Sequence, residues 1–289
     1  MNPDAVHAIR RILVALDSSR ASLAALEAAV DLAGRIDAEL LGIFVEDIEL
    51  LRMADAPYAR EILYPSAMEA PLSRGSMERN FKAQSEQART ALERAAQQAH
   101  VRWSFRTVRG EVTAELLAAA AETDLLAMGK LGWSIGTQVR IGSSALELAA
   151  SSIPVLLLPA SGVPAKPHWL VYYDDSPAAR RALLSAAQLA EADSRSITVL
   201  LATADAGEAA SMKNEIGRLL SGRGLTIEHR SIDPTEEIAL LEALRSARNV
   251  MFVVGGSEAF QKLPALEAVL RECQIPVLLL RNRAGFERK

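Results

Sequence analysis

The chain has 289 residues, 50% hydrophobic and 24% charged, which excludes intrinsic disorder and gives each half enough residues for its own core. Because 32 basic residues are set against 36 acidic ones, the net charge is −4, and neither nucleic acid nor an anionic membrane surface is an expected partner. A single cysteine excludes a disulfide framework, and apolar stretches of about eight residues are too short to span a membrane, so we expect a cytoplasmic protein without membrane insertion.

Short apolar runs alternate with amphipathic segments through the first 160 residues. The runs that predict strands are 11–16, 39–45, 102–108, 124–128 and 154–158. The segments that predict helices are 19–35, 77–99, 113–121 and 144–151. This alternation is typical of a parallel sheet that helices cover on both faces.

Residues 46–76 interrupt the alternation after the second strand. The segment is too apolar for a disordered linker, and we expect a short helix at 48–54 near the open end of the sheet. A lid over a ligand, an interface element and plain packing are the three interpretations, and the last two are favoured.

The second part of the chain repeats the first. Residues 12–33 and 169–190 match at an offset of 157, and the sequence IPVLLL occurs at both 153–158 and 275–280, an offset of 122. The difference, 157 − 122 = 35, gives the approximate size of the insertion. The strands predicted in the second copy are 168–173, 196–202, 225–230, 250–254 and 276–281. A linker near 160–167 separates two predicted domains, 1–160 and 168–289.

Two helix starts of the second copy combine a capping residue with proline. Ser176 precedes Pro177, and Asp233 precedes Pro234, so each pair predicts a helix that begins at the proline. Asp233 and Glu236 also match the capping box. We interpret both as local stability features.

A glycine-rich loop follows the fourth strand of the first copy. Glycines stand at 129, 132, 136 and 142, and Ser143 and Ser144 open a predicted helix. Exposed amides and a helix N-terminus suit phosphate oxygens, and the cations Lys130 and Arg140 are candidates for direct bonds to them. A plain strand-to-helix connection with Ser144 as its cap is the alternative. No metal-site spacing and no motif of a known catalytic machinery is present.

These residues resemble the universal stress protein family in its tandem form. The family pattern Gly-x2-Gly-x9-Gly-(Ser/Thr) is matched by Gly129, Gly132, Gly142 and Ser143, and the first strand ends in Asp17. The resemblance covers residues 8–281 apart from the insertion. It implies an α/β fold with two tandem Rossmann-like domains of the adenine nucleotide α-hydrolase type, each a five-stranded parallel sheet of order 3-2-1-4-5.

The resemblance also implies a ligand, ATP or ADP, with or without Mg²⁺. By position, Ala15 and Asp17 border the adenosine and Val45 contacts the adenine. The ribose and phosphates follow along Met128, Gly129 and Lys130, and the phosphates are held by Gly132, Gly142, Ser143 and Ser144. Asp17 has a purely structural alternative, as the polar end of a strand before a helix.

The second copy departs from the pattern. Gly255 aligns with Gly129, but Glu258 stands in place of Gly132, and Pro264 and Ala265 replace Gly142 and Ser143. A carboxylate repels phosphate and proline lacks an amide donor, so we expect triphosphate binding to be absent or far weaker there. The terminal strands 154–158 and 276–281 are expected to pair within the chain as a pseudo-dimer, which leaves a further homodimer open.

Three functions follow, of which the first is favoured. The first is a nucleotide-binding stress-response regulator, read by an unidentified protein partner, with little or no turnover. The second is a ligand-independent interaction scaffold. The third is an enzyme of the adenine nucleotide α-hydrolase type that splits or adenylylates a substrate, against which the pyrophosphate loop of such enzymes is missing after the first strand. Weak ATP hydrolysis or autophosphorylation is compatible with the first function, and Ser143 or Ser144 are the positions to examine for it.

Overall fold

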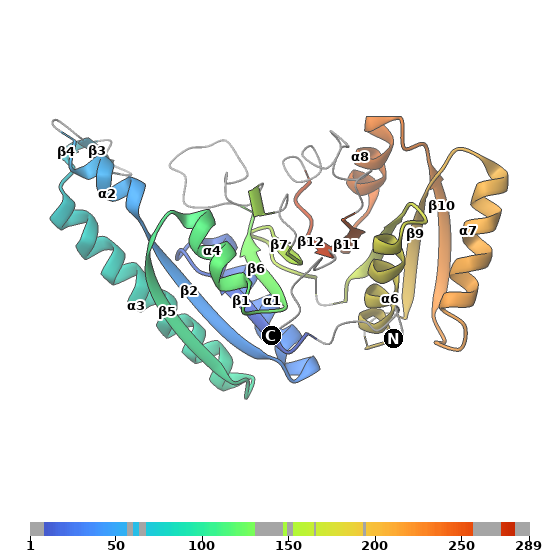
Figure 1. Cartoon of the computed structure of the whole chain (residues 1–289), viewed down its shortest axis with the longest axis horizontal. Coiled ribbons are helices and arrows are strands. Elements are labelled where there is room, and N and C mark those ends of the chain that lie inside the picture. Colours follow the sequence, from blue (N-terminus) through green and yellow to red (C-terminus); the bar gives the residue numbers. More distant parts are fainter. Residues whose placement is uncertain are drawn as a thin grey trace.

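The computed structural model describes residues 9–56, 60–63, 68–130, 147–148, 153–164, 166–192, 195–256 and 273–280. Ten strands form one continuous sheet in the order β10-β9-β8-β11-β12-β7-β6-β1-β2-β5 (Figure 1). The N-terminal half supplies β1 (Arg11–Ala15), β2 (Glu39–Asp47), β5 (Trp103–Gly110), β6 (Leu125–Gly129) and β7 (Val155–Leu158). The C-terminal half supplies β8 (His168–Tyr173), β9 (Ser196–Ala202), β10 (Thr226–Ile232), β11 (Val250–Gly255) and β12 (Val277–Leu280).

Within each half the strands are parallel and follow the order 3-2-1-4-5, which confirms the predicted fold class. The same order holds for the C-terminal half. Valine and leucine dominate the central strands because parallel strands are buried on both faces.

The two halves join through β7 and β12, which pair antiparallel. Leu156 lies opposite Leu278, and these two leucines are equivalent in the repeat because 156 + 122 = 278. The pairing therefore has a local two-fold axis, like the interface of a symmetric dimer. This confirms that the terminal strands pair within the chain, and it removes an open apolar edge from each half.

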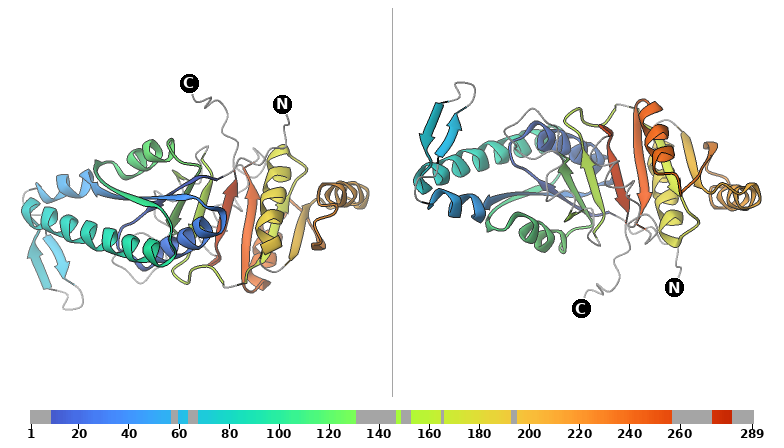
Figure 2. Two further views of the ribbon diagram at one scale, coloured as in Figure 1. Left: turned by 90° about the horizontal axis from the view of Figure 1, so that it is seen from below. Right: turned by 90° about the horizontal axis from the view of Figure 1, so that it is seen from above.

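Helices cover both faces of the sheet (Figure 2). Buried residues of α1 (Arg20–Ile36), α3 (Arg74–Gln98), α6 (Pro177–Ala192) and α7 (Ala206–Leu219) belong to the core cluster on one face. On the other face, α4 (Val112–Ala120) and α8 (Glu237–Ser246) contribute to a second cluster. Each cluster contains residues of both halves, so the hydrophobic core runs through the whole molecule.

The insertion begins with the predicted helix, α2 (Ile48–Ala54), which Asp47 caps through the amide of Glu49. It continues into a hairpin that the sequence did not predict, β3 (Arg60–Leu63) and β4 (Met68–Pro71), which is separate from the main sheet. Figure 1 shows the hairpin and α2 beyond the carboxyl end of β2.

The predicted helix starts have different outcomes. The hydroxyl of Ser176 accepts from the amide of Ala179, which confirms Ser176 as the cap of α6. The prediction for Asp233 is wrong, because α8 begins at Glu237 with Glu236 as its cap residue. Asp233 instead accepts from the amide of Thr235 at 2.8 Å and forms a tight turn before the helix.

In the described part of the chain, no helix is both long and apolar enough to span a membrane.

Candidate functional site

The strand order of the N-terminal half has its switch point between β1 and β6, and the position beyond the carboxyl ends of these two strands is here called the crevice. From β1 the chain crosses to β2 and β5 on one side, and β6 and β7 lie on the other, so the strand order reverses between β1 and β6. Ligands of open parallel sheets bind at this position, beyond the carboxyl ends of the strands. Val14 lies opposite Ala127, and the residues that follow them therefore border the same crevice.

Three residues expected beside the adenosine share one face of the sheet. Ala15, Val45 and Met128 all belong to or pack against the core cluster on the α4 side. Met128 is buried, whereas Ala15 and Val45 are partly exposed. Together they form an apolar surface at the carboxyl ends of β1, β2 and β6, which is a chemically suitable floor for a purine ring.

Asp17 lies in a tight turn between β1 and α1. Its carboxylate accepts from the amide of Ser19 at 3.0 Å, and its own amide donates to the hydroxyl of Ser22 at 3.4 Å. Ser18 between them has φ of 62°, and its hydroxyl donates to the carbonyl of Gln84 in α3 at 3.1 Å. The turn is therefore fixed both to its own helix and to α3.

The second half contains the same turn. The carboxylate of Asp174 accepts from the amide of Ser176 at 3.2 Å, and Asp175 has φ of 60°. An aspartate at this position is thus explained by turn geometry in both halves, which supports the structural interpretation of Asp17. A contact from Asp17 to a ribose remains a prediction.

Gly129 also has a packing explanation. A Cβ atom at this position would lie 2.7 Å from Cβ of Ala21 and 2.8 Å from its carbonyl carbon, in the first turn of α1. The equivalent Gly255 is pressed against the backbone of Ala178 and Ala179 in α6. Since both halves need this glycine for helix packing, its presence does not by itself indicate a phosphate site.

The side chain of Lys130 lies elsewhere than the sequence suggested. It is 1% exposed, and Nζ donates to the carbonyl oxygen of Cys273 in the C-terminal half at 2.9 Å. Burial lowers the pKa of Lys130 to about 8. The amine is engaged in a contact between the halves, and the expected bond from it to a phosphate is not supported by this arrangement.

The remaining predicted site residues, Gly132, Gly142, Ser143 and Ser144, lie outside the described residues, as do Arg140 and the second-copy residues Glu258, Pro264 and Ala265. The phosphate part of the site therefore remains a sequence prediction. Among the residues that the structure describes, no group of three or more His, Cys, Asp or Glu side chains is arranged to hold a metal ion.

The two halves differ at the apolar floor. Tyr172 occupies in the C-terminal half the position of Ala15, since 172 − 157 = 15. Its side chain is 3% exposed and belongs to the same core cluster, and burial raises its pKa to about 12. A buried phenol ring therefore stands in the C-terminal half at the position where the N-terminal half has a methyl group.

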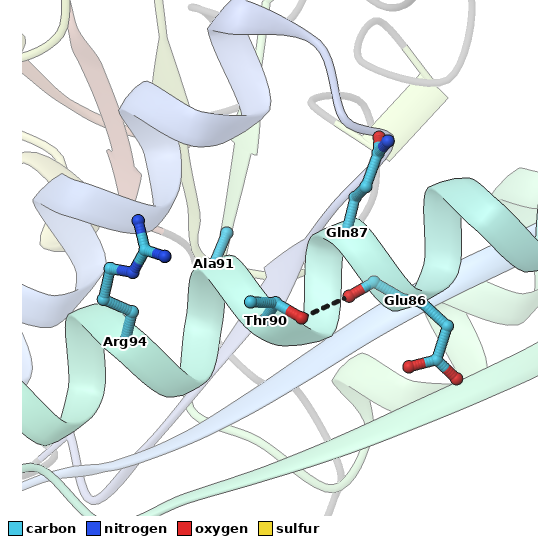
Figure 3. Close-up of a pocket in the computed structure, with 5 residues that line it drawn as sticks. All are labelled: Glu86, Gln87, Thr90, Ala91 and Arg94. Atoms are coloured by element: carbon cyan, nitrogen blue, oxygen red, sulfur yellow. Dashed lines mark hydrogen bonds between the residues drawn. The ribbon is translucent and has the colours of Figure 1, made fainter.

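A shallow groove on α3 is a weaker candidate (Figure 3). Its lining comes from that helix alone: Glu86, Gln87, Thr90, Ala91 and Arg94. The hydrogen bond drawn there, from the hydroxyl of Thr90 to the carbonyl of Glu86 at 2.8 Å, is internal to the helix. The groove brings no charged or polar groups from other elements to a common point.

Sequence reasoning missed the roles of three residues that contact predicted site residues. Ser18 and Ser22 fix the Asp17 turn, and the carbonyl of Cys273 accepts from Lys130. The repeat carried a signal for Ser18, which aligns with Asp175 beside matched aspartates, but none for Ser22, which aligns with Ala179. No local pattern signals the third contact, which joins residues 143 positions apart.

Comparisons with known proteins agree on one family. A family model, the universal stress protein family, matches residues 8–159, which is 152 of 289 residues. A solved universal stress protein from Archaeoglobus fulgidus is 18% identical, with a TM-score of 0.69 over 94% of this chain and 98% of that one. A putative universal stress protein from Pseudomonas aeruginosa is 15% identical, with a TM-score of 0.63 over 96% and 95%. The chain has no significant match among curated proteins.

Proposed function

The chain belongs to the universal stress protein family, and on this premise we propose that it is a regulatory protein of the stress response that binds ATP or ADP in its N-terminal half alone, with little or no turnover. We further infer that the two halves are separate domains of one tandem protein, 1–160 and 168–289, which a regulatory partner protein recognises.

The exchange of Ala15 for Tyr172 is the observation that supports this asymmetry best. Ala15 carries only a methyl group beside the partly exposed Val45 and the buried Met128, at the carboxyl ends of the strands where ligands of such sheets bind. In the C-terminal half the Tyr172 ring is buried at the equivalent place. We therefore propose that the N-terminal half accommodates the adenosine and that the Tyr172 ring opposes its binding in the C-terminal half.

The loop sequences support the same asymmetry for the phosphates. The N-terminal loop keeps Gly132, Gly142 and Ser143, whereas Glu258 and Pro264 stand at the equivalent positions of the C-terminal loop. Glycine permits close approach of amides to an anion, and glutamate and proline oppose it through charge and loss of a donor.

We infer low turnover from the hydrogen bonding of Asp17. Asp17, at the end of the first predicted strand, is the candidate general base, and its carboxylate already accepts a hydrogen bond from the Ser19 amide. A side chain that is fixed in a turn is poorly placed to activate a water molecule. We therefore propose that the nucleotide, with or without Mg²⁺, acts as a ligand whose occupancy changes the surface that a partner reads.

Two variants that copy the C-terminal half test the proposal. Ala15→Tyr fills the crevice and Gly142→Pro removes an amide of the loop, so each should weaken ATP and ADP binding at least tenfold by isothermal titration calorimetry. The matched control is Tyr172→Ala, which changes the equivalent position in the other half and should leave nucleotide affinity unchanged.

Three results would contradict the proposal. Wild-type protein that shows no thermal shift with millimolar ATP would favour a ligand-independent scaffold, because a ligand of the native state must raise its apparent stability. Undiminished affinity in both variants would place the nucleotide elsewhere. Steady ATP consumption well above one equivalent per chain, or phosphate transferred to Ser143 or Ser144, would favour an enzyme.

A further inference from the structure

Lys130, the last described residue before the predicted phosphate loop, is fixed on two sides. Its amide donates to the carbonyl of Leu158 in β7 at 2.7 Å. Its buried side chain donates from Nζ to the carbonyl of Cys273 at 2.9 Å. The start of the loop is thus bonded both to the neighbouring strand and to the residue that lies shortly before β12.

The direction of the side chain follows from the strand order. The order β12-β7-β6-β1 places the C-terminal half on one side of β6 and the Asp17 turn on the other. Cys273 precedes β12, and β12 runs antiparallel to β7, so its beginning lies near the carboxyl end of β7. The Lys130 side chain therefore crosses the end of β7, away from the crevice beside β1.

The side chain that joins the two halves comes from the N-terminal half and has no counterpart in the C-terminal half. Gly256 is the equivalent of Lys130, since 130 + 126 = 256, and its amide makes the same backbone bond, to the carbonyl of Leu280 at 2.8 Å. Glycine has no side chain to reach back across β12. The pseudo-symmetry of the sheet is therefore broken at the residue where the predicted loop begins.

The hydrogen bond between Lys130 and Cys273 links the positions of these two residues. An amine at 1% exposure that lost its carbonyl acceptor would be left buried without that partner, which is costly. A displacement of residue 130 is therefore expected to carry the segment that begins at Cys273 with it. A movement of Lys130 or Cys273 alone would break this hydrogen bond, so we expect the two residues to move together.

We propose that Lys130 is a positioning residue that couples nucleotide occupancy in the N-terminal half to the beginning of β12 in the C-terminal half through its bond to Cys273. The inference rests on the proposed function, because it assumes that the nucleotide borders Gly129 and Lys130. Coupling between two sites is reciprocal, so the C-terminal half also contributes to the affinity of the N-terminal half for nucleotide.

The experiment compares the full-length wild type with Lys130→Met, which keeps the length of the side chain and removes the donor. Lys130→Gln, which retains a shorter donor, is the second variant. The control is Arg35→Met, because Arg35 also joins the halves, through the Leu189 carbonyl at 3.3 Å, but from α1 on the opposite face. Calorimetry gives the affinity for ATP, and hydrogen exchange with mass spectrometry follows residues 273–280 with and without saturating ATP.

We expect ATP to slow exchange at 273–280 in the wild type and in Arg35→Met. In Lys130→Met that effect should disappear at saturating ATP, and affinity should fall about fivefold or more, with a smaller loss in Lys130→Gln. ATP binding without any change at 273–280 in the wild type would overturn the coupling and leave the proposed function standing. So would a Lys130→Met protein in which ATP still slows that exchange. Failure of the wild type to bind ATP would overturn both.

Discussion

At the scale of single residues, the glycines that end β6 and β11 are determined by helix packing. The neighbours of a Cβ atom at Gly255 would be backbone atoms of Ala178 and Ala179, which cannot rotate away. At Gly129 the neighbours are equally fixed but farther away: the nearest is Cβ of Ala21 at 2.7 Å, whereas the nearest atom at Gly255 is 2.3 Å away. The two positions therefore permit a graded test of how closely helix and strand approach each other.

We predict that Gly255→Ala lowers the free energy of unfolding by about 1–3 kcal/mol and that Gly129→Ala lowers it less. The reason is overpacking against α6 and α1. Gly217→Ala in α7 is the control, since no atom lies within 4 Å of its Cβ position and alanine favours a helix. Urea titration measures all three, and a Gly255→Ala protein as stable as wild type would refute the packing explanation.

The buried amine of Lys130 gives a pH dependence with a defined sign. Its pKa is about 8 in the folded protein, against 10.5 for an ordinary lysine, because burial disfavours the charged form. Between these pH values the unfolded chain binds more protons than the folded chain, so stability rises with pH. Below pH 8 the full cost of burying the charge is present.

Comparison of wild type with Lys130→Met from pH 7 to 10 isolates this effect. Methionine carries no charge, so the stability of the wild type should rise relative to the variant by up to about 3 kcal/mol across that interval. Urea unfolding at each pH gives the difference. A stability difference that does not change with pH would show that the amine is solvated or that its pKa is normal.

At the scale of elements, the predicted bounds of a strand or helix match the structure where the local sequence pattern is strong. The strands at 168–173 and 196–202 have the predicted bounds, because continuous apolar runs end sharply at polar residues. The start of α8 was misplaced, because Asp233 stabilises a turn and a helix start through the same kind of side-chain bond. A capping residue before proline therefore does not distinguish a turn from the start of a helix.

The hairpin β3–β4 escaped prediction for a different reason. Its strands have four residues each, too short for an alternating pattern to stand out from a general apolar composition. One ion pair joins the two ends of the segment that contains the hairpin, from Arg74 to Asp55 at 2.6 Å. A contact between residues 19 positions apart leaves no local signal in the sequence.

In the candidate site, too, local patterns determine some features and contacts between distant residues determine others. Ala15, Val45 and Met128, to which the resemblance assigns ligand contacts, lie on one face because strand parity and parallel register determine which residues share a face. The ligand contacts themselves remain predictions. The destination of the Lys130 side chain depended on how the two halves associate. The antiparallel pairing of β7 and β12 determines how the halves associate. The repeated sequence suggested that these strands pair, but it did not predict the register of the pairing.

At the scale of the whole molecule, the two halves share their core. Leu156 and Leu278 meet at the local two-fold axis, and both core clusters contain residues from each half. Each half therefore buries apolar surface that it would expose alone. Removal of packing at the junction should consequently weaken both halves, whichever half contributes the altered residue.

We predict that the halves unfold in one cooperative transition and that Leu156→Ala shifts it as a whole. Leu156 is 4% exposed, so truncation should cost about 2–5 kcal/mol. Fluorescence of proteins that retain Trp103 alone, in the N-terminal half, or Trp169 alone, in the C-terminal half, reports each half separately during urea unfolding. Both probes should give coincident midpoints that Leu156→Ala lowers equally, whereas Leu23→Ala, at a residue 38% exposed, should move them little. If Leu156→Ala lowers the midpoint reported by Trp103 and leaves that of Trp169 unchanged, the halves are independently stable, and the shared core contributes no cooperativity between them.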